Sequence, residues 1–155
     1  MFGLRLVAGG DTEALAAVDV GAKAANLAAM ARAGLAVPPA FVLPVGFCAA
    51  VAEGRADALA ALDRRLAEGI AFLERTTGRR FGDRRRPLLV SVRSGAARSM
   101  PGMLETVLNV GADETTVAGL VRLTGNLRFA LDCRRRFLEG WAETVLGLDP
   151  RPLAE

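Results

Sequence analysis

The clearest candidates for chemistry are an arginine that ends an apolar run and the loop that follows it. The run Val90–Val92 ends at Arg93, and small residues then lead to a Met-Pro-Gly-Met sequence at positions 100–103. A second β-type run, Thr106–Val110, closes the unit. A guanidinium and free backbone N–H groups at the mouth of two paired strands suit the oxygens of a phosphate group. The spacing therefore indicates an anion-binding strand pair.

Both features also have structural explanations. Arg93 would serve equally well in a salt bridge, because a desolvated guanidinium needs an anion of some kind. The methionines around Pro101 and Gly102 contribute little to a core if exposed, and their polarisable thioethers suit a flap over a planar ligand. The same residues are also compatible with an ordinary hairpin turn.

Lys23 is the second candidate for an anion ligand. It follows Gly21 and Ala22 in a turn and opens a predicted helix, where unpaired N–H groups carry partial positive charge. Lys23 is the single lysine among the 20 Lys and Arg residues of the sequence. A coding bias that favours arginine over lysine would explain this. A lone Gly-x-Lys lacks the flanking glycines of the longer phosphate-loop motif. A solvated lysine in a turn therefore stays the alternative to phosphate binding.

The composition excludes several kinds of site. The sequence has no histidine and only two cysteines, so it offers no histidine base, no histidine metal ligand and no phosphohistidine, and too few thiols for a cysteine-rich metal site. Cys48 and Cys133 each fall in an apolar helical stripe, and we expect both to be free thiols in the core. We accordingly assign no metal ligand and no catalytic residue.

The charge pattern argues against nucleic acid and membrane partners. Arginine clusters lie at 79–80, 84–86 and 134–136, but they lack interleaved aromatics, and the net charge is only +3. A solvated surface is the simpler explanation. No apolar run reaches the roughly 18 residues of a membrane span, and the first residues do not resemble a signal peptide. We therefore expect a cytoplasmic protein.

Apolar spacing, prolines and glycines predict four to five helices and three to four short strands. The helices are expected at 23–33, 44–53, 57–77, 114–124 and from 126 onward. The strands are expected at 5–8, 40–43, 88–92 and 106–110. This order fits an α+β or an α/β fold, of which we adopt α+β. With 52% hydrophobic but only 5% aromatic residues, the core should be built from small residues.

Two helical stripes are expected to face this core. They are Leu59, Leu62, Leu66, Ile70 and Leu73 in one helix, and Phe129, Cys133, Phe137, Trp141 and Val145 in another. Gly69 should cost its helix on the order of 1 kcal/mol. The run Leu88–Val92, which is apolar except for Ser91, predicts a strand buried on both faces.

Three stretches of the sequence, at 20–41, 77–109 and 123–149, resemble the N-terminal part of pyruvate, phosphate dikinase. They contain Val-Gly-Ala-Lys, Ser-Val-Arg-Ser-Gly and Ser-Met-Pro-Gly-Met. The related phosphoenolpyruvate synthases share the first stretch in looser form, and the Ser-Met-Pro-Gly-Met loop favours the dikinase. The resemblance implies the first lobe of an ATP-grasp domain, residues 1–112, and part of its helical insert, residues 113–155.

The resemblance also implies roles for particular residues. Lys23 and Arg93 correspond to the phosphate-binding lysine and arginine of the family. Ala22 departs from the pattern, because the family usually has a second glycine there. The loop that closes over the nucleotide phosphates corresponds to Ser99, Met100, Pro101, Gly102 and Met103. We add Thr106 to the nucleotide-binding residues.

The implied ligand is ATP, with Mg²⁺ only when a partner lobe supplies its carboxylates. The segment should not turn over pyruvate by itself, and a partner chain would carry the second lobe and the phosphohistidine domain. An apolar face left uncovered would favour such pairing or self-association. The alternatives are a nucleotide-sensing regulator of a full-length dikinase, or a degenerate fragment.

Overall fold

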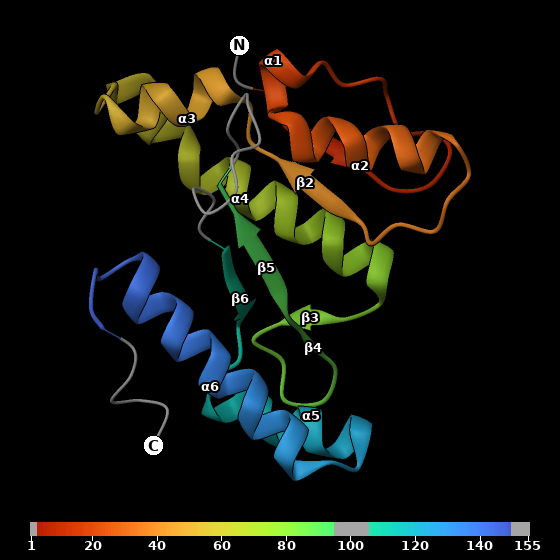
Figure 1. Ribbon diagram of the computed structural model, residues 1–155, viewed down its shortest axis with the longest axis vertical. Helices are drawn as coiled ribbons and strands as arrows, with labels where there is room; N and C mark the ends of the chain where they lie inside the picture. Colours follow the sequence, from red (N-terminus) through yellow and green to blue (C-terminus); the bar gives the residue numbers. More distant parts are fainter. Residues whose placement is uncertain (1–2, 95–105, 150–155) are drawn as a thin grey trace. The chain divides into compact units, whose positions relative to one another are not determined.

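The computed structural model describes residues 3–94 and 106–149 (Figure 1). The helices in this part of the chain are α1 (Ala17–Val20), α2 (Ala22–Arg32), α3 (Val45–Ala52), α4 (Ala56–Thr77), α5 (Glu114–Thr124) and α6 (Leu127–Thr144). The strands are β1 (Arg5–Val7), β2 (Ala40–Val42), β3 (Arg80–Phe81), β4 (Pro87–Leu88), β5 (Val90–Arg93) and β6 (Thr106–Val110). The α+β class is confirmed. The expected counts were too low, because α1, β3 and β4 are too short to show a period.

The chain divides into two compact units, each described here by itself. One is formed by the residues up to Thr77, and the other by Gly78–Ser94 together with the described residues from 106 onward. The division into an ATP-grasp lobe at 1–112 and a helical part at 113–155 stays a prediction.

In the first unit, α2 packs on an antiparallel pair formed by β1 and β2. The register places Leu6 opposite Phe41. Val7, Ala28 and Ala31 are fully buried and form the centre of this cluster. Two alanines facing a valine allow close approach of the helix to the strands, as the predicted small-residue core requires.

Helix α4 uses its glycine for packing. A Cβ on Gly69 would lie 2.5 Å from ring carbons of Phe41 in β2, so no side chain fits there without displacement of the ring. The residue predicted only to weaken α4 therefore lets the helix rest directly on the aromatic ring. Further along, Ala58 and Ala61 of α4 pack with Phe47 of α3.

The predicted stripe of α4 is only partly correct. Leu73 is buried, and Leu62 packs against the cluster around Phe47, but Leu59 and Leu66 are exposed. The buried face is centred on smaller residues, which leaves these two leucines at its edge.

Cys48 corrects a second expectation. Both cysteines are free and Cys133 is buried, as predicted, but Cys48 is exposed. Helix α3 buries Phe47 and Ala50, and a position between them on the helix must point away from that side. Partial desolvation still raises the pKa of the Cys48 thiol.

The second unit contains a short parallel pair, β3 with β4, and an antiparallel pair, β5 with β6. The turn between β3 and β4 is held by the Asp83 carboxylate, which accepts hydrogen bonds from the N–H groups of Arg85 (2.6 Å) and Arg86 (2.8 Å). The N–H of Arg86 first, and then that of Arg85, lower the pKa of Asp83 by stabilising its carboxylate. The arginine-rich segment is therefore an ordered turn.

Helices α5 and α6 lie within a residue of the predicted starts at 114 and 126, and each begins at a side-chain cap. Asp113 accepts from the N–H of Thr116 at the start of α5, and Gly125 ends that helix in the left-handed conformation. Asn126 accepts from the N–H of Phe129 at the start of α6. Each side-chain cap satisfies an N–H that has no partner within its helix.

The predicted core stripe of α6 is wrong in part. Cys133 lies in the core with Leu120 and Ala130, but Phe129, Trp141 and Val145 are exposed. A step of four residues overshoots one helical turn by about 40°. Residues repeated strictly every four positions therefore spiral around the helix and cannot all face the same core.

The strand run Leu88–Val92 is not buried on both faces. Leu88 is buried, whereas Val92 is 54% exposed. Helix α6 packs against β6, and a Cβ on Gly140 would lie 3.7 Å from the backbone of Thr106 and Val107. The helix thus covers β6 rather than its partner strand.

Of the described helices, none is long and apolar enough to cross a membrane.

Candidate functional site

The predicted anion site lies at the open end of the β5–β6 pair. Arg93 is the last residue of β5, and Thr106 is the first of β6. The register places them directly opposite each other, so both side chains stand on the same face. Ser91 shares this face with Arg93, because alternate residues of a strand point the same way. The face thus carries a guanidinium and two hydroxyls.

Helix α6 and a bulge fix the strand pair. Val90 pairs with Val110 and Val92 with Val107, so β6 has one more residue than β5 between these pairs. Asn109, inside this bulge, has a left-handed φ of 55°. Its side-chain amide donates to the carbonyl of Cys133 in α6 at 3.3 Å. This bond ties the bulge to the core helix, while Arg93 stays exposed at the other end of its strand.

Arg93 forms no ion pair with a carboxylate of the described residues. The salt-bridge interpretation therefore finds no partner in this part of the chain. An exposed guanidinium next to hydroxyls is available to an external anion, and its fork of N–H donors suits a phosphate group.

Lys23 is the second residue of α2, and its side chain is exposed. Gly21 precedes the helix with φ 82° and ψ 154°, a conformation essentially restricted to glycine. This glycine also donates its N–H to Ala17 at 2.8 Å, which joins α1 to α2. No side chain in the described part of the chain caps α2, and the first turn of the helix holds no acidic residue. Its first N–H groups therefore have no side-chain acceptor among the described residues, and their role as anion ligands stays a prediction.

The structure brings together some of the predicted residues. Arg93 and Thr106 are neighbours in the second unit. Lys23 lies in the first unit, and because the two units are described separately, its pairing with Arg93 stays a prediction. The loop predicted to cover the phosphates, Ser99, Met100, Pro101, Gly102 and Met103, lies outside the described residues.

The described residues hold no group of three or more acidic or cysteine side chains that could bind a metal ion. The two free cysteines lie in different units, so they do not form a dithiol site within either unit.

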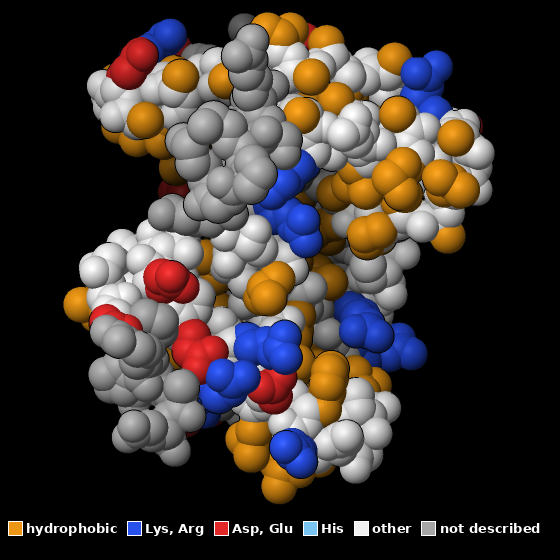
Figure 2. All heavy atoms as spheres, viewed as in Figure 1, with side chains coloured by type: hydrophobic (Ala, Val, Ile, Leu, Met, Phe, Trp, Pro, Cys, Tyr) orange, Lys and Arg blue, Asp and Glu red, His pale blue; other side chains and the backbone are white. Residues whose placement is uncertain are grey.

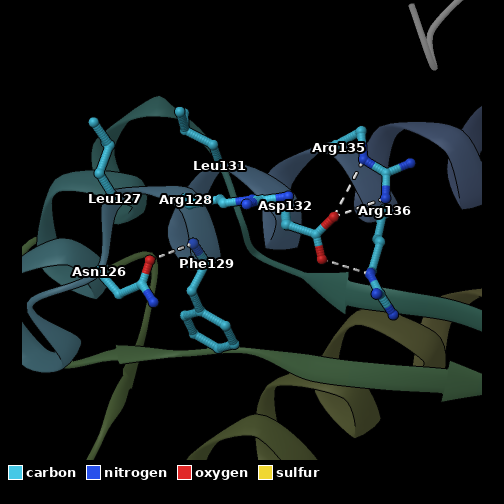
Figure 3. Close-up of a pocket in the computed structure, with 8 residues that line it drawn as sticks. All are labelled: Asn126, Leu127, Arg128, Phe129, Leu131, Asp132, Arg135 and Arg136. Carbon is cyan, nitrogen blue, oxygen red and sulfur yellow. Dashed lines mark hydrogen bonds and ion pairs between the residues drawn. The ribbon is translucent and has the colours of Figure 1, made fainter.

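A shallow, open hollow lies along α6 and its N-terminal end (Figure 3). It is lined by Asn126, Leu127, Arg128, Phe129, Leu131, Asp132, Arg135 and Arg136. None of the predicted nucleotide-binding residues lines it. Asp132 accepts from Arg135 and Arg136, each at 2.7 Å, and the hydrogen bond from Arg135 is the main reason that the pKa of Asp132 is lowered.

These arginines form a surface network, as the sequence predicts for the cluster 134–136. Arg135 also contacts Glu139, and Arg134 contacts Glu114 of α5 at 2.9 Å. Side chains of both charges gather over α6 on the face shown in Figure 2. The positive charge of this cluster is therefore largely balanced by neighbouring carboxylates.

The chain is similar to pyruvate, phosphate dikinases. It is 45% identical to the enzyme of Rhizobium meliloti (strain 1021) over 130 residues, which cover 84% of the chain and 14% of that relative. It is 43% identical over 130 residues to the Giardia intestinalis dikinase, covering 84% of the chain and 15% of the relative. It is 44% identical over 136 residues to the chloroplastic dikinase 1 of Zea mays, covering 88% and 14%.

These similarities confirm the resemblance predicted from the sequence, since the relatives of this chain are pyruvate, phosphate dikinases. The chain spans about 14% of the length of the relatives that it matches. No protein-family model matches it.

Proposed function

We propose that this chain is the nucleotide-binding, N-terminal portion of a pyruvate, phosphate dikinase-like phosphotransferase, built as the first lobe of an ATP-grasp domain. Lys23, Arg93 and Thr106 bind the phosphate groups of ATP in this proposal. The observation that carries it is the pairing of Arg93 with Thr106 at the ends of β5 and β6. An exposed cation and a hydroxyl lie directly opposite each other where no described carboxylate competes.

The proposed roles follow from the chemistry of each group. Arg93 supplies two parallel N–H donors to one phosphate group. Thr106 donates its hydroxyl to an oxygen of the same group. Lys23 adds a point charge on a flexible stem, together with the first N–H groups of α2. All three groups bind and orient the phosphates, and none of them takes part in bond making.

In this proposal, the catalytic groups belong to a partner lobe and not to this chain. The sequence has no histidine to carry a phosphoryl group. In this proposal, the one or two carboxylates that typically hold Mg²⁺ against the nucleotide phosphates belong to a partner lobe. Metal ligands and a phosphoryl carrier would come from a partner lobe, so we expect ATP binding without turnover of pyruvate by this chain.

Calorimetric titration of the full chain with ATP tests the proposal. We expect millimolar or tighter binding that is weakened at least about tenfold, or about 1.4 kcal/mol, by Lys23→Ala and by Arg93→Ala. Arg32→Ala at the other end of α2 and Arg64→Ala on α4 are matched controls, because both remove an exposed arginine outside the proposed site. Absence of binding at millimolar ATP, or equal loss in all four variants, would contradict the proposal.

A further inference from the structure

Helix α6 carries a second apolar face that the described residues of its unit leave exposed. Its members recur at alternating spacings of four and three, and we call them the α6 seam: Leu127, Leu131, Arg134, Leu138, Trp141 and Val145. The five apolar members are all exposed, from 42% for Trp141 to 58% for Leu127. The spacing is that of the a and d positions of a heptad repeat.

The seam adjoins the buried residues of the helix, which are Ala130, Cys133 and Ala142. Ala130 and Cys133 of α6 are buried with Leu120, and the helix rests on β6 through a face that includes Gly140. Figure 3 shows Leu127 and Leu131 pointing to one side of α6 and the ring of Phe129 to the other. The fold therefore has its core without the seam, and the exposed leucines need another explanation.

The surface along the seam is hollowed. Leu127 and Leu131 line the open hollow at the start of the helix. A second, smaller hollow further along is lined by Leu131, Arg134, Arg135 and Leu138. A four-three repeat with depressions between its side chains accepts the side chains of another helix, each inserting between four residues.

Arg134 is the one charged member of the seam. Its side chain is only 33% exposed and contacts the carboxylate of Glu114, whose own side chain is 83% exposed. A single polar residue at a core position of such a repeat selects the partner and its register. The Glu114 carboxylate can swing into solvent, so a carboxylate from the partner can replace it on Arg134.

The same charge disfavours a second copy of this chain. A parallel copy would place Arg134 against its own equivalent. An antiparallel copy matched over the full seam would place Arg134 against Leu138, where no carboxylate of the second copy meets the guanidinium. Like charges facing each other at a helix interface are unfavourable.

We propose that the α6 seam is a docking surface for an amphipathic helix of another polypeptide segment, with leucine-type residues at its core positions, an acidic residue opposite Arg134 and acidic residues along its flanks. Charge complementarity to Arg134 and to the exposed Arg128 selects an acidic helix over a neutral or basic one. This inference does not depend on nucleotide binding.

A designed peptide of three heptads tests the proposal. It carries Leu at the core positions, Glu at the flanking positions and one core Glu to meet Arg134, and a control peptide has Lys in place of every Glu. Trp141 is the only tryptophan of the chain and lies on the seam, so its fluorescence reports docking directly. We expect the Glu peptide to shift the emission to the blue and to reduce acrylamide quenching. The Lys peptide should bind about tenfold more weakly.

Variants of the full chain test whether peptide binding depends on the α6 seam or on other parts of the surface. Arg134→Glu should reverse the preference between the two peptides, and Leu138→Asp should abolish docking. Leu123→Asp is the matched control, because Leu123 is 48% exposed on α5, outside the seam, and it should not change docking. If Leu138→Asp lowers helicity in circular dichroism, Leu131→Ala and Leu138→Ala replace it, and both should weaken docking.

Several results would overturn the proposal. These are the absence of a fluorescence change with the Glu peptide, equal binding of the two peptides, or an unchanged preference in Arg134→Glu. A dimer in sedimentation that Leu138→Asp abolishes would instead assign the seam to a second copy. Binding to phosphatidylserine vesicles through Leu138, with no preference between the peptides, would assign it to a membrane surface.

Discussion

Two basic regions of this molecule differ in what surrounds their charges. On α6, Arg134, Arg135 and Arg136 each contact a carboxylate. At the end of β5, Arg93 lies opposite a hydroxyl and contacts no carboxylate of the described residues. The region with more arginines is therefore the poorer anion site. The local pairing of a charge, and not the number of charges, decides whether it is available to a ligand.

The largest expected contrast between the two regions is in ATP binding. Reversal of charge in Arg93→Glu should weaken binding by about 2 kcal/mol or more, roughly thirtyfold, because a charge-assisted hydrogen bond is replaced by repulsion. Arg136→Glu should leave the affinity within a factor of about two, since Arg136 contributes to a network that is already neutralised. Isothermal titration of both variants measures the difference, and equal losses would remove the distinction between the regions.

A second contrast concerns the glycines at the two ends of α2, the helix that carries Lys23. Gly21→Ala should destabilise the first unit by about 1–2 kcal/mol, because alanine is strained at φ 82° and ψ 154°. The same change should weaken ATP binding through the displaced start of α2. Thermal and urea unfolding measure the stability, and titration measures the affinity. Gly34→Ala, at φ 80° just after α2, should cost similar stability but leave ATP affinity unchanged.

The variant Thr106→Val tests whether the Thr106 hydroxyl binds ATP at the ends of β5 and β6. Valine keeps the β-branched shape and removes only the hydroxyl, so we expect a loss of ATP affinity of about 0.5–1.5 kcal/mol with little change in folding. Thr115→Val on the exposed first turn of α5 is the matched control. An unchanged affinity in Thr106→Val would leave Arg93 as the ligand at this strand pair and remove Thr106 from the site.

The features that could be predicted from the sequence are those that depend on neighbouring residues. Asp113, Asn126 and Gly125 set the ends of α5 and α6 because a cap needs only the next turn of its own helix. The strand ends at Arg93 and Thr106 were predicted in the same way, from runs of β-branched residues. Local chemistry thus gave the position of the candidate site along the chain.

The features that could not be predicted depend on distant partners. Gly69 is required by the ring of Phe41, which belongs to a different element. The exposure of Trp141 follows from the position of α6 over β6, whereas a four-residue repeat alone suggested the core. The bulge at Asn109 depends on a carbonyl of α6. None of these partners is visible in the local sequence, so they emerge only once the elements are assembled.

The smallest expected effect is a pH-dependent change in stability at Asp132 of α6, which is measured by acid titration. Asp132 has a lowered pKa in the folded chain, chiefly because Arg135 donates to it, so its ion pairs add stability above the ordinary value of 3.8. That stability is lost as the pH falls below this value and through the lowered folded pKa. Asp132→Asn should therefore be slightly less stable than the wild type near neutral pH and should converge with it in acid.

Urea unfolding between neutral pH and about pH 2 measures this convergence. Asp63→Asn is the matched control, because Asp63 is an exposed carboxylate on α4 that forms no ion pair with another described residue. A difference between wild type and Asp132→Asn that stays constant with pH would show that Asp132 does not hold the charges of Arg135 and Arg136. The pairing of charges would then not explain why the α6 arginines and Arg93 differ as anion ligands.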